Sequence, residues 1–202
     1  NMVGGDDPRV EPIPPTTLFG LIPGLGRAVQ RFADALTTWP TPLTVLLTVV
    51  AGALYALLAW LYGRGNGFLY RQNAVGHPVN MVLHAIRLFF VPALLEEIIF
   101  RVALLPHPVE GVVGWRWLFW GTVSFVLFVL YHWLLGKTIY RGAHSTFSDP
   151  RFLVLVGWLG LVLIGLYWIT GSLWLVTGLH WFVVVVWIYA FGGRDRLPTA
   201  AA

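Results

Sequence analysis

Two adjacent carboxylates, Glu96 and Glu97, lie with Arg101 inside an apolar stretch of the chain. A charged side chain at the centre of a membrane helix costs several kcal/mol, so such groups face the interior of a helix bundle and often form a functional site. Glu97 and Arg101 are four residues apart and can pair along one helical face. Glu96 points about 100° away from that face and is left to act as a general base, with the pair as its support. The alternative is an ion pair that only fixes the register of the helix.

Two histidines, His132 and His180, lie in two other apolar stretches. A single histidine on an apolar helix is usually a packing residue. Two of them, on different helices from Glu96 and Glu97, are harder to explain in that way. Histidine and glutamate bind divalent metals or polarise water at neutral pH. The set therefore predicts a site that activates a water molecule for attack on a carbonyl group.

Two other functions fit part of this pattern. A bis-histidine haem protein would use His132 and His180 as axial ligands, but it leaves Glu96 and Glu97 without a role. A proton-coupled transporter would also place glutamate and histidine in the membrane. About five short spans without an inverted repeat argue against a transporter.

The composition predicts an integral membrane protein. Of the 202 residues, 57% are hydrophobic and 11% are charged, whereas a soluble domain has about 45–50% apolar and about 25% charged residues. The lipid bilayer is therefore the expected partner of most of the chain. The formal net charge is +4, but no basic face indicates nucleic-acid binding. The chain has no cysteine, which excludes disulfides and thiolate chemistry.

The fold predicted from these stretches is an all-α, polytopic membrane helix bundle with about five transmembrane spans and an N-terminal amphipathic helix. A span needs roughly 20 mostly apolar residues. The second span contains the carboxylates and is read as one long helix kinked at Pro92, or as two pieces joined at Val91-Pro92. The expected spans cover about residues 43–62, 77–105, 115–136, 152–170 and 173–191.

Three regions follow from these expectations: an N-terminal region 1–40, a membrane-embedded domain 41–192 and a C-terminal tail 193–202. Residues 1–17 are expected to be irregular because they are rich in proline. Residues 23–38 have apolar side chains every three to four positions, which predicts an amphipathic helix. This helix lies either on the membrane surface or against the protein's own bundle.

The basic residues predict the orientation of the protein in the cell membrane or another internal membrane. Five spans place the two termini on opposite sides. The loops after the first and third spans and the C-terminus hold seven Arg and Lys residues, and the opposite side holds four. The excess predicts a cytoplasmic C-terminus.

The motifs in their order along the chain resemble a known family. Roughly residues 40–192 are similar to the intramembrane endopeptidases of the CPBP group, also called Abi proteins. These are relatives of the CAAX prenyl endopeptidases, which remove the last three residues from prenylated proteins. The resemblance is carried by Glu96-Glu97-x-x-x-Arg101, by Phe128-x-x-x-His132 and by His180 in a terminal helix.

The resemblance implies a CPBP-type intramembrane protease that acts on a peptide or a prenylated protein. It implies that Glu96 is the general base and that His132 and His180 hold the water, or a divalent metal such as zinc, together with Glu96. Glu97 and Arg101, with the Phe128 of the second motif, are then supporting residues. The family has been described both as metal-dependent and as using a metal-free water, so both options stay open.

One position departs from the family pattern. The last family motif is His-x-x-x-Asn or His-x-x-x-Asp, and here its fourth position is Val184. If the polar residue donates to the developing oxyanion, its loss removes about 3–4 kcal/mol of transition-state stabilisation. Ser124 and Thr177 lie in the right helices to substitute for it. The alternative is a non-catalytic member of the fold that packs in, or helps to assemble, a larger membrane complex. The 11 tryptophans would then be partner surfaces rather than interfacial anchors.

Overall fold

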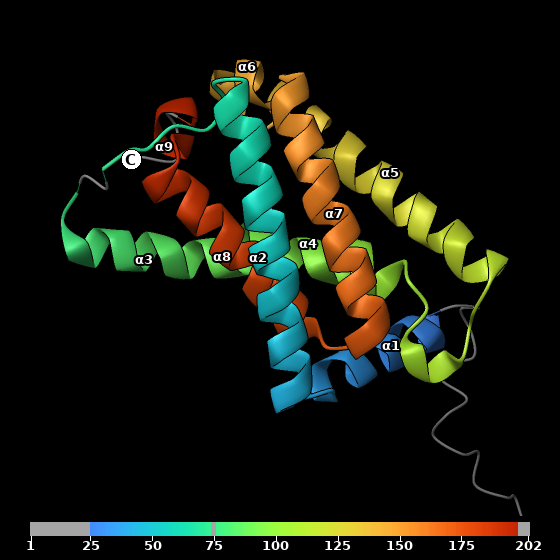
Figure 1. Cartoon of the computed structure of the whole chain (residues 1–202). Helices are drawn as coiled ribbons and strands as arrows, with labels where there is room; N and C mark the ends of the chain where they lie inside the picture. The colour runs from blue at the N-terminus through green and yellow to red at the C-terminus, as the bar shows by residue number, and fades with distance from the viewer. Residues whose placement is uncertain (1–24, 74–75, 198–202) are drawn as a thin grey trace, which may run out of the picture.

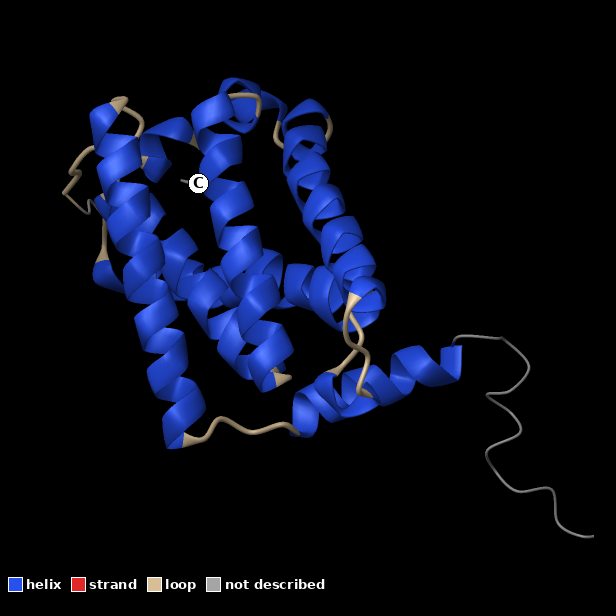
Figure 2. Cartoon of the chain, turned by 45° about the vertical axis from the view of Figure 1, so that its right-hand side comes forward, coloured by secondary structure: helices blue, strands red, loops and turns tan. Residues whose placement is uncertain are grey.

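The computed structural model of the protein describes residues 25–73 and 76–197, and these contain helices and loops but no strand. The helices form one bundle, in which segments far apart in the sequence pack together (Figures 1 and 2). The all-α, polytopic fold is therefore confirmed. The segment 1–17, which was expected to be irregular, lies outside the described residues.

Four helices of the described residues are long and apolar enough to cross a membrane. Each agrees within three residues with a span expected from the sequence, because the length of an apolar run is set by the thickness of the bilayer. The protein is an integral membrane protein. These helices are α2 (Pro42–Gly65), α5 (Trp115–Lys137), α7 (Pro150–Thr170) and α8 (Leu173–Ala190).

Local signals in the sequence set the ends of these helices. The hydroxyl of Thr41 accepts from the backbone N–H of Thr44 at the start of α2, and a proline occupies the first turn. Asp149 caps the start of α7 by accepting from the backbone N–H of Arg151. Helix α7 ends at Gly171, whose φ of 64° is left-handed and suits glycine. The chain therefore turns at once into α8, which packs against α7.

The segment that carries the carboxylates differs from the other four. It consists of α3 (Pro78–Leu88), the π-helical turn η3 (Phe89–Leu94), α4 (Leu95–Glu97) and a second π-helical turn η4 (Ile98–Ala103). Figure 1 shows that α3 and α4 run crosswise to α2 and α7 instead of alongside them. Val91, with φ −138° and ψ 113°, interrupts the helix, because the residue before a proline is pushed out of the helical region. The expected break at Val91-Pro92 is present. The second expected span, about residues 77–105, is not among the four helices of the described residues that could cross a membrane, because this segment is divided into short pieces that lie across the others (Figure 1).

Helix α1 (Leu25–Thr37) is amphipathic and packs on the end of the bundle. Ala35 is fully buried, and the backbone oxygen of Leu36 accepts from the indole N–H of Trp174 in α8 at 2.9 Å. Arg31 forms two hydrogen bonds, of 2.7 and 2.9 Å, with Glu110 in the 3₁₀ turn η5 (Pro108–Glu110). Val29 stays about half exposed. The helix therefore docks on its own bundle and keeps part of its apolar face outside.

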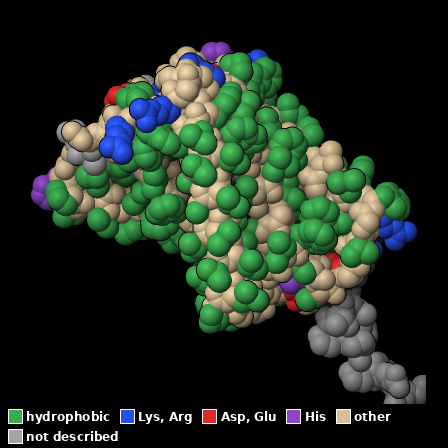
Figure 3. Space-filling view, in the orientation of Figure 1, with side chains coloured by type: hydrophobic (Ala, Val, Ile, Leu, Met, Phe, Trp, Pro, Cys, Tyr) green, Lys and Arg blue, Asp and Glu red, His purple; other side chains and the backbone are tan. Residues whose placement is uncertain are grey.

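The outer surface of the bundle is apolar and its core is centred on α7. Hydrophobic side chains cover most of the face seen in Figure 3, and Lys and Arg side chains gather mainly at one end of it. Helix α7 buries the largest share of its length among the four spans, and α2 the smallest. The remaining short elements are η6 (Arg141–Ala143), α6 (His144–Phe147) and α9 (Gly193–Arg196), which lie at that same end in Figure 1.

Candidate active site

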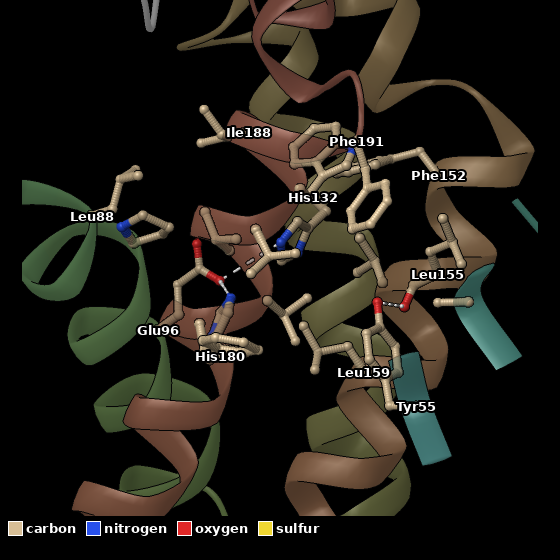
Figure 4. A pocket seen from close by; sticks show the side chains of 18 of the residues that line it. Tyr55, Leu88, Glu96, His132, Phe152, Leu155, Leu159, His180, Ile188 and Phe191 are labelled. Atoms are coloured by element: carbon tan, nitrogen blue, oxygen red, sulfur yellow. Dashed lines mark hydrogen bonds and ion pairs between the residues drawn. The ribbon is translucent and has the colours of Figure 1, made fainter. Parts of the chain in front are cut away.

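Three elements bring Glu96, His132 and His180 to one point inside the bundle. Glu96 comes from α4, His132 from α5 and His180 from α8, and all three side chains are buried. Glu96 Oε2 lies 3.7 Å from Nε2 of His132 and 3.8 Å from Nε2 of His180 (Figure 4). These separations are too long for direct hydrogen bonds. They are short enough for one water oxygen to contact each pair of atoms at about 2.8–3.0 Å.

The ion pair expected from the sequence is present. Arg101 Nε lies 3.1 Å from Glu97 Oε2, and both side chains are fully buried. The other oxygen of Glu97, Oε1, lies 2.7 Å from Nδ1 of His180. The guanidinium of Arg101 stacks over the ring of Phe128 at 4.3 Å. The pair therefore does more than fix one helix, because it connects the carboxylate segment to α5 and α8.

Phe128 supports both imidazoles. Its backbone oxygen lies 2.9 Å from Nδ1 of His132, one turn along α5. Its ring contacts the ring of His132 with centroids 4.5 Å apart and that of His180 with centroids 6.0 Å apart. The Phe128-x-x-x-His132 spacing thus places the backbone acceptor and the imidazole on one helical face.

The partners of the two histidines fix their tautomers. A backbone carbonyl only accepts hydrogen bonds, so Nδ1 of His132 is the donor to Phe128. Glu97 is ion-paired and its oxygen accepts from Nδ1 of His180. In the neutral imidazoles, the two Nε2 atoms that face Glu96 are therefore acceptors. Glu96 Oε2 is buried and has no hydrogen-bond partner. Three acceptor atoms thus face one another around a small polar space.

A family model of Rce1-like type II CAAX prenyl endopeptidases matches residues 78–186, which is just over half of the chain. The chain belongs to this family. The matched range contains all of the residues at the site described above, and it confirms the resemblance found in the sequence motifs. No curated protein and no solved structure matches the chain.

The side chains of the described residues bear on whether this family member holds a metal. The described residues contain no group of three or more His, Cys, Asp or Glu side chains placed to hold a metal ion. No step of the chemistry below passes through a metal.

In this CAAX endopeptidase family member, Glu96, His132 and His180 lie in the wall of a cavity of about 710 Å³. The rest of the wall is mainly apolar and comes from α2, α5, α7 and α8, including Tyr55 and Leu159 (Figure 4). Such a volume is in the range of sites that bind small ligands. The cavity gives an apolar substrate group direct access to the carboxylate and the imidazoles.

The two residues that sequence reasoning offered in place of the missing polar residue do not reach this cavity. Val184 lies in the cavity wall, whereas Ser124 and Thr177 do not. The hydroxyl of Ser124 donates to the backbone oxygen of Phe100 at 2.7 Å, and Thr177 is fully buried. Neither side chain is therefore placed to contact a substrate in the cavity, although Thr177 lies only one turn before His180 on α8.

Arg71 and Trp187 are among the polar residues of the cavity wall that sequence reasoning missed. Arg71 is one of the seven Arg and Lys residues from which the sequence predicts the orientation in the membrane. Trp187 is one of the 11 tryptophans interpreted above as interfacial anchors or partner surfaces, but it is seven residues after His180 and therefore lies on the same face of α8. That helical spacing was the available signal.

Proposed function

We propose that the protein cleaves a peptide bond of a prenylated protein substrate inside the membrane, with water as the nucleophile and Glu96 as the general base. The observation that carries this proposal is Glu96 Oε2, a buried oxygen without a hydrogen-bond partner that faces two imidazole nitrogens. A buried polar atom of this kind is costly. Water bound between the three atoms supplies the missing hydrogen bonds.

The reaction follows from the positions of these atoms. The water oxygen attacks the carbonyl carbon of the scissile bond while Glu96 takes one of the water protons. The carbonyl oxygen becomes an oxyanion. The carbon–nitrogen bond then breaks, and the proton on Glu96 passes to the leaving nitrogen. The products are a new carboxyl group on the prenylated part and a free amine on the released peptide.

The number of protons at the site accounts for oxyanion stabilisation. A water molecule donates only two hydrogen bonds. Three acceptor atoms can therefore all bond to one water only when one of them carries an additional proton. In the proposed mechanism an imidazole carries this proton on Nε2 and donates it in a hydrogen bond to the oxyanion. This donor takes the place of the polar residue that Val184 replaces.

Glu97 and Arg101 act as positioning residues. The 2.7 Å contact from Glu97 Oε1 holds the ring of His180 with Nε2 toward Glu96. Arg101 compensates the charge of Glu97, which would otherwise be buried and unpaired. An apolar cavity beside this arrangement suits the hydrocarbon of a prenyl group.

The side from which substrate arrives follows from the basic loops. Their Arg and Lys residues lie at one end of the bundle, which supports a cytoplasmic position for this end and for the C-terminus. These residues are Arg64, Arg71, Lys137, Arg141, Arg151, Arg194 and Arg196.

The test is hydrolysis of a prenylated CAAX peptide by the purified protein in detergent or liposomes. Glu96→Gln removes the base and should lower kcat by about 10²–10⁴-fold. The matched control is Asp34→Asn on α1, whose carboxylate accepts a hydrogen bond from Gln30 and from no other residue in the described part of the chain. A Glu96→Gln variant as active as the wild type would refute the assignment.

Val184 favours a second candidate function, a non-catalytic member of the fold that packs in a larger membrane complex. It removes the polar residue of the last family motif and leaves an aliphatic side chain in the cavity wall. The two candidates differ in the expected effect of Val184→Asn. If the protein is an enzyme with a weak oxyanion site, the new donor raises kcat, by at most about 10²–10³-fold. A folded wild type and a folded Val184→Asn variant that both fail to cleave support the non-catalytic function.

A further inference from the structure

Resting on the proposed function, we infer that Arg71 and Trp187 form a subsite for the free C-terminal carboxylate of the substrate, at the far end of the same cavity. Arg71 is the one Lys or Arg among the described residues that line the cavity. No ion pair or hydrogen bond joins it to another described residue. A guanidinium without a carboxylate partner at the end of an apolar cavity is a binding group for an anion.

The chain around Arg71 is held in place. The side chains of Tyr70 and Gln72 both donate to Asp195, at 2.8 and 2.7 Å. The backbone N–H of Gln72 donates to the oxygen of Ala190 at 2.9 Å. In an extended segment, alternate side chains point to opposite sides. Arg71 is therefore directed away from Asp195 and toward the cavity.

Trp187 provides a second donor between Arg71 and the proposed reaction centre. Its indole N–H is buried and has no hydrogen-bond partner among the described residues. The indole ring stacks on Phe68 and packs on Phe152, so the N–H has a fixed position. An unpaired buried donor needs an explanation. A carbonyl of a bound peptide supplies the acceptor.

The rise of α8 between His180 and Ala190, less the reach of the Arg71 side chain, is comparable with the length of the tripeptide that a CAAX endopeptidase removes. Ala190, which bonds to Gln72, is ten residues after His180 on α8, or about 15 Å along the helix. The Arg71 side chain covers part of this distance. Three extended residues span about 10–11 Å. A scissile carbonyl at Glu96 thus places a terminal carboxylate near Arg71.

The experiment compares two prenylated peptides that differ only at the C-terminus, one with a free carboxylate and one with an amide. A charge-assisted hydrogen bond predicts a KM for the amide that is about tenfold to hundredfold higher in the wild type. Arg71→Gln should reduce this ratio to nearly one. Arg64→Gln, the matched control, should keep it, because Arg64 stacks on Trp60 and does not line the cavity. Trp187→Phe should raise KM for both peptides.

The outcomes separate this inference from the proposed function. Cleavage of both peptides with equal KM by the wild type overturns the subsite and leaves the proteolytic function intact. If neither peptide is cleaved, the proteolytic function fails. Binding of the same two peptides, measured by fluorescence anisotropy, then decides the subsite. The subsite is supported if the wild type binds the free acid more tightly than the amide and Arg71→Gln binds both equally. It is refuted if the wild type binds both peptides equally.

Discussion

The buried ion pair between Glu97 and Arg101 gives the most direct test of how the site is held together. Arg101→Met removes the 3.1 Å ion pair, the stacking of the guanidinium over Phe128 at 4.3 Å and a weak hydrogen bond to Gly160. It also leaves the charge of Glu97 buried without compensation. Breaking such a pair on one side costs about 3–5 kcal/mol of unfolding free energy. We expect Arg101→Met to fall in that range.

The double variant Glu97→Gln with Arg101→Met should be more stable than the Arg101→Met variant. Both charges are removed together, so no unpaired charge remains, and the double-mutant cycle should give a coupling of about 2–3 kcal/mol. The glutamine oxygen can still accept from Nδ1 of His180. The double variant should therefore retain more activity than Glu97→Leu, which offers no acceptor.

The measurement is equilibrium unfolding in mixed detergent micelles, followed by tryptophan fluorescence. The control is Arg116→Met at an exposed position, which should change the unfolding free energy by less than about 0.5 kcal/mol. A cost below about 1 kcal/mol for Arg101→Met, with additive single effects, would refute the view that the buried pair supports the site.

Two further predictions concern packing and pH. An alanine Cβ at Gly160 would lie 3.0 Å from the ring of Phe128, whereas one at Gly165 would meet nothing within 4 Å. Gly160→Ala should therefore displace the ring that supports both imidazoles, lower kcat and cost about 1–3 kcal/mol in stability. Gly165→Ala should leave kcat unchanged. Equal kcat values in the two variants would contradict this prediction. Burial raises the pKa of Glu110, but its hydrogen bonds to Arg31 and the charge of that residue lower it more, so the net pKa is below the ordinary value of 4.5. The stabilisation of α1 is thus complete above about pH 4.5 and is lost as pH falls through the lower folded-state pKa. The protection factors of the α1 amides, which correct exchange rates for their intrinsic pH dependence, should fall below that pH in the wild type and should already be low at neutral pH in Arg31→Gln. Protection factors that do not change with pH would contradict the role of the pair.

The sequence by itself determined the lipid-facing parts of the protein and the ion pair. A bilayer requires about 20 apolar residues per span, so the ends of α2, α5, α7 and α8 could be predicted within three residues. Glu97 and Arg101 pair within one turn, and this contact depends only on the helical repeat. The motif order also identified the family before any coordinates were known.

Tertiary structure decided how the residues of different helices meet. The rotation and depth of α4, α5 and α8 relative to one another set the distances of 3.7 and 3.8 Å from Glu96 to the two imidazoles, and helical periodicity within one segment contains no information about them. The same packing leaves Ser124 and Thr177 outside the cavity wall and places Arg71 in it. It also laid the carboxylate segment across α2 and α7 (Figure 1), because η3 packs against α8 and η4 packs against α5.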